Sequence, residues 1–207
     1  MGSIVCKFGG TSLADANRLR KVAQIIRSDS RRRYVVPSAP GKRDPDDIKI
    51  TDLLYLCHEL AREKFHFAEP FERIEVRYLE LVGELGLGLD MAGLLNRLKK
   101  DIEGGASEDF VASRGEFLCG QVLADLLGAT FVDPADGIRF RPDGQLDEVS
   151  YDLLKERLEG EGLFVVPGFY GSDPEGGIQT FSRGGSDISG AIVARAVEAE
   201  EYENWTD

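Results

Sequence analysis

The chain has 207 residues, of which 42% are hydrophobic, and it carries a formal net charge of −12 at pH 7. This length fits one large domain or two small ones, and the apolar fraction suffices for a buried core. The acidic balance argues against a nucleic-acid partner or an acidic membrane surface, because both favour a positively charged face. No apolar run approaches the roughly 20 residues that span a bilayer, so no membrane partner is expected.

The three cysteines, Cys6, Cys57 and Cys119, are odd in number, widely spaced and without a C-x-x-C pair. This pattern indicates neither a disulfide framework nor a thiolate metal site, and it fits a cytoplasmic protein. The one basic cluster is the run 31–33, which we interpret as a solvated helix end before a strand.

The first half of the chain predicts two short strands separated and followed by helices. The strands are at 3–7 and 34–36, and the helices at 15–28, 51–60, 70–85 and 91–102. Thr51 is the predicted N-cap of the second helix, after a loop rich in Pro, Gly and Asp. The helical block at about 51–105 is expected to be an excursion from the sheet, and the sequence leaves open whether it forms a lid or a subunit contact.

The second half continues the alternation of helices and strands. Helices are predicted at 113–127, 147–158 and 188–198, and strands at 129–133 and 162–169, with a turn and hairpin at 134–144. Such alternation predicts an α/β fold in which helices cover both faces of a mainly parallel sheet, a three-layer α/β/α sandwich. Ligands of such folds bind at the carboxyl ends of the strands.

The segment KFGGTS follows the first predicted strand and has the residues of a phosphate site. Gly9 and Gly10 allow the backbone to approach an anion closely, the coming helix supplies positive potential, and Lys7 adds a mobile charge. It is not a Walker A loop, because here the lysine precedes the glycines. A plain strand-to-helix turn with an exposed lysine fits this stretch equally well.

The segment SRGGSD has a similar composition near the other end of the chain. Arg183 has the geometry to bind a carboxylate or phosphate with two hydrogen bonds, and Asp187 is able to hold a lysine in place. Helix capping by Ser186 and Asp187 is the alternative, although capping needs no arginine.

Two further features have ordinary structural interpretations. The segment ASRGE places Ser113 and Glu116 at a predicted helix start, as a capping box does. His58 and His66 lie within helical patterns without a second ligand set, so neither a metal site nor a Ser-His-Asp arrangement is predicted.

The segments KFGGTS, SAPGK with TDLL, SRGE, PGF, SRGGSD and WTD follow one another through nearly the whole chain. Together they resemble the catalytic domain of the aspartokinases, in the amino-acid kinase family. The resemblance implies that family's α/β/α fold. It also implies transfer of the ATP γ-phosphoryl group to the side-chain carboxylate of L-aspartate, giving 4-phospho-L-aspartate for lysine, threonine and methionine biosynthesis. A carboxylate is already a nucleophile at neutral pH, so no catalytic histidine is required.

By this resemblance, Lys7 neutralises charge on the transferring phosphoryl group, and Asp187 orients Lys7. Backbone N–H groups of Gly9 and Gly10 bind phosphate, and Ser38 lines the same path.

For aspartate itself, the resemblance assigns the α-carboxylate to Arg183 and the ammonium group to Glu116, with Thr51 and Ser186 as further polar contacts. Mg²⁺ is expected to bridge the ATP phosphates, mainly through water and phosphate oxygens, without an assigned protein ligand.

In the family, the WTD segment continues into further nucleotide-binding residues and regulatory ACT domains, whereas this sequence ends at Asp207. We therefore expect an incomplete C-terminal part, with Thr206 and Asp207 matching the start of the nucleotide motif at a free chain end. Two alternatives to an active aspartate kinase stay open. One is an incomplete fragment that binds aspartate or phosphate, and the other is a kinase of another small amino acid. Homo-oligomer formation is also left open.

Overall fold

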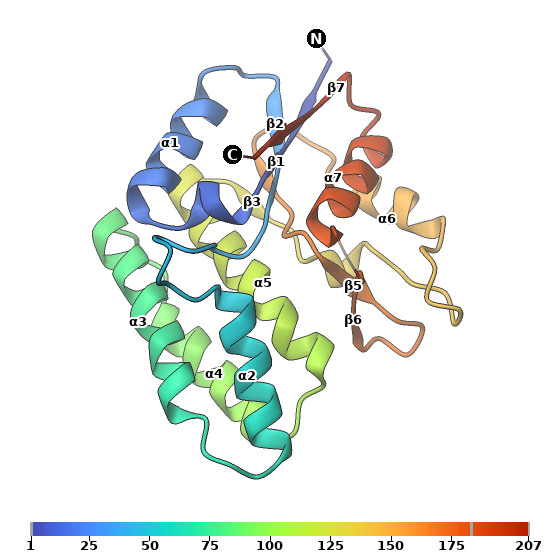
Figure 1. The fold of residues 1–207 in the computed structure, drawn as a ribbon. Coiled ribbons are helices and arrows are strands. Elements are labelled where there is room, and N and C mark those ends of the chain that lie inside the picture. Colours follow the sequence, from blue (N-terminus) through green and yellow to red (C-terminus); the bar gives the residue numbers. More distant parts are fainter. Residues whose placement is uncertain (1, 183, 207) are drawn as a thin grey trace.

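A computed structural model describes residues 2–182 and 184–206. Its central sheet has five strands, all parallel, in the order β3-β4-β2-β1-β7 (Figure 1). These strands are β1 (Ile4–Phe8), β2 (Arg32–Pro37), β3 (Thr130–Phe131), β4 (Phe164–Val165) and β7 (Glu201–Trp205). A separate antiparallel hairpin consists of β5 (Tyr170–Ser172) and β6 (Ile178–Thr180).

Seven α-helices lie in the part of the chain that the structure describes, together with two short 3-10 helices at Gly10–Leu13 and Pro134–Asp136. The α-helices are α1 (Ala16–Arg27), α2 (Ile50–Arg62), α3 (Ala68–Leu85), α4 (Met91–Glu103), α5 (Glu108–Leu127), α6 (Val149–Arg157) and α7 (Gly185–Ala196). None of the helices within these described ranges combines the length and apolar character needed to cross a bilayer.

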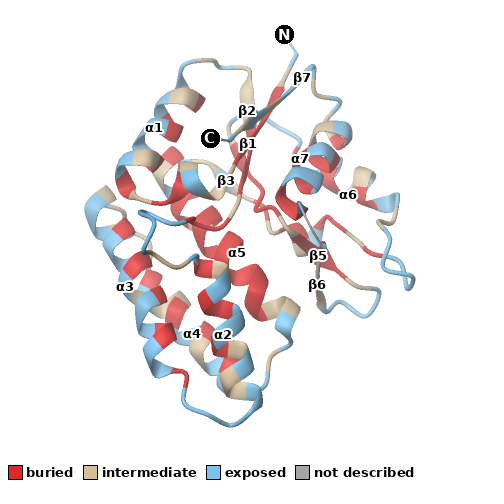
Figure 2. Cartoon of the chain, viewed as in Figure 1, coloured by how far each residue is buried: buried red, intermediate tan, exposed pale blue. Residues whose placement is uncertain are grey.

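Alternating side chains of the sheet enter two separate cores, as the pleat of a strand requires. Ile4, Cys6 and Phe8 of β1 pack with α1 to α5, whereas Val5 packs on the opposite face with α6 and α7. Helix α5 lies across the sheet and is buried along much of its length (Figure 2). These two cores confirm the predicted α/β/α layers around a mainly parallel sheet.

Two helices begin earlier than the sequence predicts. Helix α2 begins at Ile50 with Lys49 as its N-cap, so the prediction that Thr51 is the cap is wrong. Helix α5 begins at Glu108, where the Ser107 side chain accepts a hydrogen bond from the Phe110 N–H. Ser107 followed by Glu108 and Asp109 is a favourable helix start, and it overrides the weaker start signal at Ser113.

The early start of α5 changes the meaning of the segment SRGE. Ser113 and Glu116 lie inside the helix and are buried, so they do not form the capping box that the spacing suggested. Their polar side chains therefore need another explanation than helix capping.

The last described strand, β7, is absent from the sequence prediction because EYENW lacks an apolar run. It pairs with β1 along its full length, and Trp205 stacks on Phe8 with ring centroids 6.0 Å apart. The Glu203 carboxylate accepts hydrogen bonds from the Arg32 guanidinium, the Trp205 indole and the Cys6 thiol. Arg32 therefore belongs to a strand and a half-buried ion pair, not to the solvated helix end predicted for the run 31–33.

The Arg32–Glu203 pair should contribute measurably to stability. Glu203→Gln removes the charge from a site with three donors, and we expect a loss of about 1–3 kcal/mol in the free energy of unfolding. Urea denaturation measures this loss. Glu198→Gln, which breaks the exposed pair with Lys155, is the matched control and should leave the free energy unchanged. Equal effects of both substitutions would contradict a stabilising role of the Arg32–Glu203 pair.

Candidate active site

The candidate site lies at β1, where the strand order of the sheet switches from one side to the other. Strand β1 has β2 on one side and β7 on the other, and such switch points open a crevice at the carboxyl ends of the strands. Near this end, Lys7 pairs in register with Val36 on β2 and Asn204 on β7. The phosphate-site lysine predicted from sequence therefore occupies the expected position for ligand binding in an α/β fold.

Lys7 is held by a carboxylate from helix α7. Its Nζ atom lies 2.7 Å from Oδ1 of Asp187, in the first turn of α7, and the Lys7 side chain is only 6% exposed. The Asn204 side-chain amide donates to the same oxygen at 3.1 Å. The two motifs at opposite ends of the sequence thus meet through this ion pair, and Asn204 is a contact that sequence reasoning missed.

The glycine turn after β1, Gly9 and Gly10, makes close contacts with the backbone of neighbouring segments. The Gly9 N–H donates to the Trp205 carbonyl at 3.0 Å, so this N–H is already engaged by protein. A Cβ atom on Gly10 would lie 2.8 Å from the Ala39 carbonyl oxygen, closer than side chains are found. The Gly41 N–H donates to the Gly10 carbonyl at 2.8 Å. Gly10 is therefore required for the approach of the segment that follows β2.

That segment, residues 38–49, is called the 38–49 loop below. Ser38, at its start, is partly buried and donates its backbone N–H to the Phe8 carbonyl at 3.1 Å. The loop ends at α2, where Thr51 is partly buried in the first helical turn. Ser38 thus lies beside the glycine turn, at the carboxyl end of its strand.

Glu116 carries the most unusual group of the site. One of its carboxylate oxygens, Oε2, is buried and has no hydrogen-bond partner among the described residues. Burial raises the pKa of Glu116 to about 8, although the Ala39 backbone N–H and the Arg114 charge act in the opposite direction. A buried carboxylate oxygen without a hydrogen-bond donor is costly unless a ligand supplies one.

Gly115 explains how Glu116 reaches the 38–49 loop. A Cβ atom on Gly115 would lie 2.8 Å from the Cβ of Ala39, so only glycine allows this approach of α5. The Gly115 carbonyl accepts a hydrogen bond from the buried Tyr78 hydroxyl at 2.7 Å. Glu116 is thereby fixed next to the loop that begins at Ser38.

Ser186 joins the same end of the sheet from α7. It is buried and lies against Gly168, where an added Cβ would come within 2.6 Å of the Ser186 Cβ. The N-cap of α7 is Gly184, with a φ of 60° and no side-chain cap. The alternative that Ser186 and Asp187 serve as helix caps is therefore not what the structure has.

The remaining predicted residues divide into two groups. Thr206 lies beside the glycine turn, since a Cβ on Gly9 would be 3.6 Å from its Cγ2 atom, and it borders a cavity of about 210 Å³ with Thr11 and Ser12. Arg183 and Asp207 lie outside the described residues.

The histidines lie elsewhere. The His58 Nδ1 atom is 3.7 Å from a carboxylate oxygen of Glu108, and His66 follows α2 and lines a surface hollow with Lys99. Among residues 2–182 and 184–206, no group of three or more His, Cys, Asp or Glu side chains is placed to hold a metal ion.

Residues 2–207 match the sequence model of the amino acid kinase family. The chain belongs to this family. Aspartokinase 3 of Bacillus subtilis is 37% identical over 98% of the chain, and lysine-sensitive aspartokinase 3 of Escherichia coli is 30% identical over 99%. The chain spans about half the length of these relatives, 48% and 49% respectively.

Solved structures of amino acid kinases share the fold. Aspartate kinase of Clostridium acetobutylicum superposes with a TM-score of 0.98 at 50% identity, over the whole chain and 48% of that protein. Aspartokinase III of E. coli, in complex with aspartate and ADP, superposes with a TM-score of 0.83 at 28% identity, over 99% of the chain and 49% of that protein.

The raised pKa of Glu116 has a consequence for stability. A carboxyl group whose folded pKa of about 8 exceeds its unfolded value stabilises the fold fully only below the unfolded pKa. This contribution is lost as the pH rises from about 5 to 8. Glu116→Gln should therefore flatten the decline in the free energy of unfolding over that range, as measured by urea denaturation at several pH values. A decline as steep as in the wild type would contradict the buried, protonated state.

Proposed function

We propose that this chain carries the catalytic unit of an aspartate kinase, which transfers the ATP γ-phosphoryl group to the side-chain carboxylate of L-aspartate. The product, 4-phospho-L-aspartate, would serve lysine, threonine and methionine biosynthesis in the cytoplasm. The relatives named above support this proposal, including the E. coli protein whose structure contains aspartate and ADP.

The unpaired Oε2 atom of Glu116 is the observation that carries the choice of an amino-acid substrate. A substrate ammonium group would supply the missing hydrogen bond and charge at once. In this proposal Arg183 binds the α-carboxylate, while Ser38, Thr51 and Ser186 line the space around the substrate. One acid and one arginine suffice to recognise the two charges of an amino acid.

Phosphoryl transfer between two anions mainly requires charge cancellation and alignment. Lys7 would provide the positive charge, and its pairing with Asp187 keeps the ammonium group at one place at the strand end. The substrate carboxylate attacks directly, so this scheme needs no proton acceptor.

For the nucleotide, we propose that Gly9 and Gly10 contact the phosphates and that Thr206 and Asp207 contact the nucleotide further out. The Gly9 N–H donates to Trp205, so Gly9 would contribute close approach and Gly10 the hydrogen bond. Mg²⁺ would be held chiefly by phosphate oxygens and water, in keeping with its preference for oxygen ligands.

A second candidate is an incomplete unit that binds aspartate without transferring phosphate. In this candidate the Glu116 carboxyl group would still bind the ammonium group of aspartate. A kinase of another small amino acid is the third, and binding of other amino acids tests it.

The test combines a hydroxamate assay for acyl phosphate with the substitution Lys7→Met. With Mg-ATP and aspartate, the wild-type chain should form hydroxamate, and Lys7→Met should lower the rate at least about 100-fold. Lys100→Met, on the exposed face of α4, is the control and should retain full activity.

Aspartate binding by calorimetry separates the remaining outcomes. Binding without hydroxamate would favour the incomplete unit. If the folded wild-type chain shows no aspartate binding and forms no hydroxamate, the proposed aspartate site is contradicted. Preferential binding of another amino acid would change the proposed substrate.

A further inference from the structure

Arg77 is a buried arginine outside the site described above. It lies on the apolar face of α3, between Ile74 and Tyr78, and is 4% exposed. Its Nη2 atom donates to the carbonyls of Gly41, at 2.8 Å, and Ala14, at 3.3 Å. One guanidinium group thus joins α3 to the 38–49 loop and to Ala14, which ends the 3-10 helix Gly10–Leu13.

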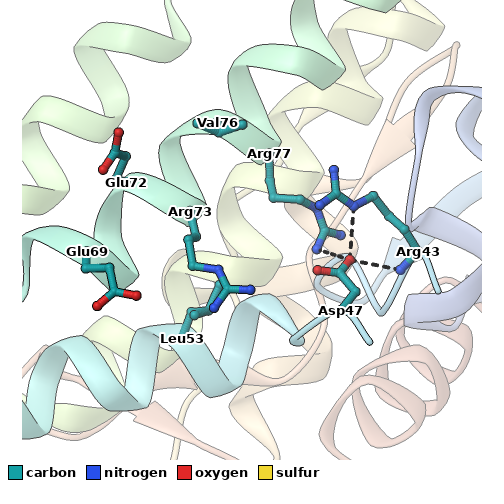
Figure 3. Close-up of a pocket in the computed structure, with 8 residues that line it drawn as sticks. All are labelled: Arg43, Asp47, Leu53, Glu69, Glu72, Arg73, Val76 and Arg77. Atoms are coloured by element: carbon teal, nitrogen blue, oxygen red, sulfur yellow. Dashed lines mark hydrogen bonds and ion pairs between the residues drawn. The ribbon is translucent and has the colours of Figure 1, made fainter. Parts of the chain in front are cut away.

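The same side chain also binds a carboxylate within the 38–49 loop. Its Nη1 atom lies 2.7 Å from Oδ2 of Asp47, and that oxygen also accepts from the backbone N–H and the Nε of Arg43 (Figure 3). Burial raises the pKa of Asp47, but these donors lower it to about 2, so the carboxylate is charged at neutral pH. The loop is therefore closed on itself and fastened to α3 at one carboxylate.

The fastened loop supplies two walls of the candidate site. Gly41 donates to the carbonyl of Gly10, which belongs to the glycine turn. Ala39 lies against Gly115, and the Ala39 backbone N–H donates a hydrogen bond to the Glu116 carboxyl group. A shift of Gly41 and Ala39 would thus displace the glycine turn and Glu116 together.

We propose that Arg77 is a positioning residue for the reaction, which holds the 38–49 loop against the glycine turn and Glu116. This rests on the proposed function for the identity of the ligand, aspartate, but not for the effect on the loop. Arg77 touches no proposed substrate atom and acts through Gly41 and Asp47.

Arg73 provides a matched comparison on the same helix. It lines the same cavity of about 290 Å³, one turn before Arg77, and it is exposed (Figure 3). Figure 3 shows Arg77 and Arg43 converging on Asp47, whereas Arg73 lies apart from that carboxylate. Removing either arginine deletes one positive charge from this cavity, so a difference between them reports on the contacts of Arg77.

The experiment compares Arg77→Met, Arg77→Lys and Arg73→Met in the full 207-residue chain. Hydrogen–deuterium exchange measures protection of the 38–49 loop, calorimetry measures the aspartate Kd, and thermal unfolding reports global stability. We expect Arg77→Met to raise loop exchange and the aspartate Kd about tenfold each, because misplacement of positioning groups is costly. Arg77→Lys should restore part of the affinity through Asp47, although an ammonium group cannot span all acceptors. Arg73→Met should change neither quantity.

The outcomes separate the two proposals. Wild-type loop protection in folded Arg77→Met would overturn the positioning role. A lower Tm with unchanged Kd and loop exchange would also overturn it, in favour of a purely structural role. If the wild-type chain binds no aspartate, the proposed function fails, while loop exchange still decides the role of Arg77. If Arg77→Met does not fold, Arg77→Lys and Asp47→Asn give the same two readouts, and wild-type values in both would overturn the proposal.

Discussion

The candidate site depends on the contact between two glycine backbones, Gly10 after β1 and Gly41 after β2. The hydrogen bond between them leaves no room for a side chain, and it fixes the distance between two loops at neighbouring strand ends. Gly115 repeats the device on α5, where it allows Ala39 to reach the helix. The sheet supplies the alignment of the strands, and these small residues set how closely the surrounding segments approach.

Because the segments pack so closely, the charged side chains of the candidate site are largely buried. The Lys7 charge is paired with Asp187, whereas Glu116 keeps one oxygen without a partner. Burial of such a group costs free energy in the free protein, and a ligand with an ammonium group would recover it on binding. The paired Lys7 and the unpaired Glu116 oxygen therefore support the proposal of an amino-acid site next to a phosphate site.

Much of the fold follows from apolar periodicity, because β1, β2 and β4 are buried on both faces and read as apolar runs. Strand β7 was not predictable in this way, since it is polar and at the edge of the described sheet. The resemblance predicts that Asp187 lies beside Lys7, and the two are in contact. Arg77 could have been suspected, because it interrupts an apolar helical stripe, but its partners are fixed only by tertiary packing. The roles of Arg183 and Asp207 stay predictions.

Binding of an ammonium group by Glu116 is best tested by calorimetry of aspartate binding near pH 7 in two buffers that differ in ionisation enthalpy. With a pKa of about 8, Glu116 is mostly protonated before binding, and an approaching ammonium group should displace that proton. We expect release of up to about one proton per aspartate bound, which Glu116→Gln should abolish while weakening binding. Tight aspartate binding without proton release, and with the same affinity in Glu116→Gln, would show that Glu116 does not bind the ammonium group.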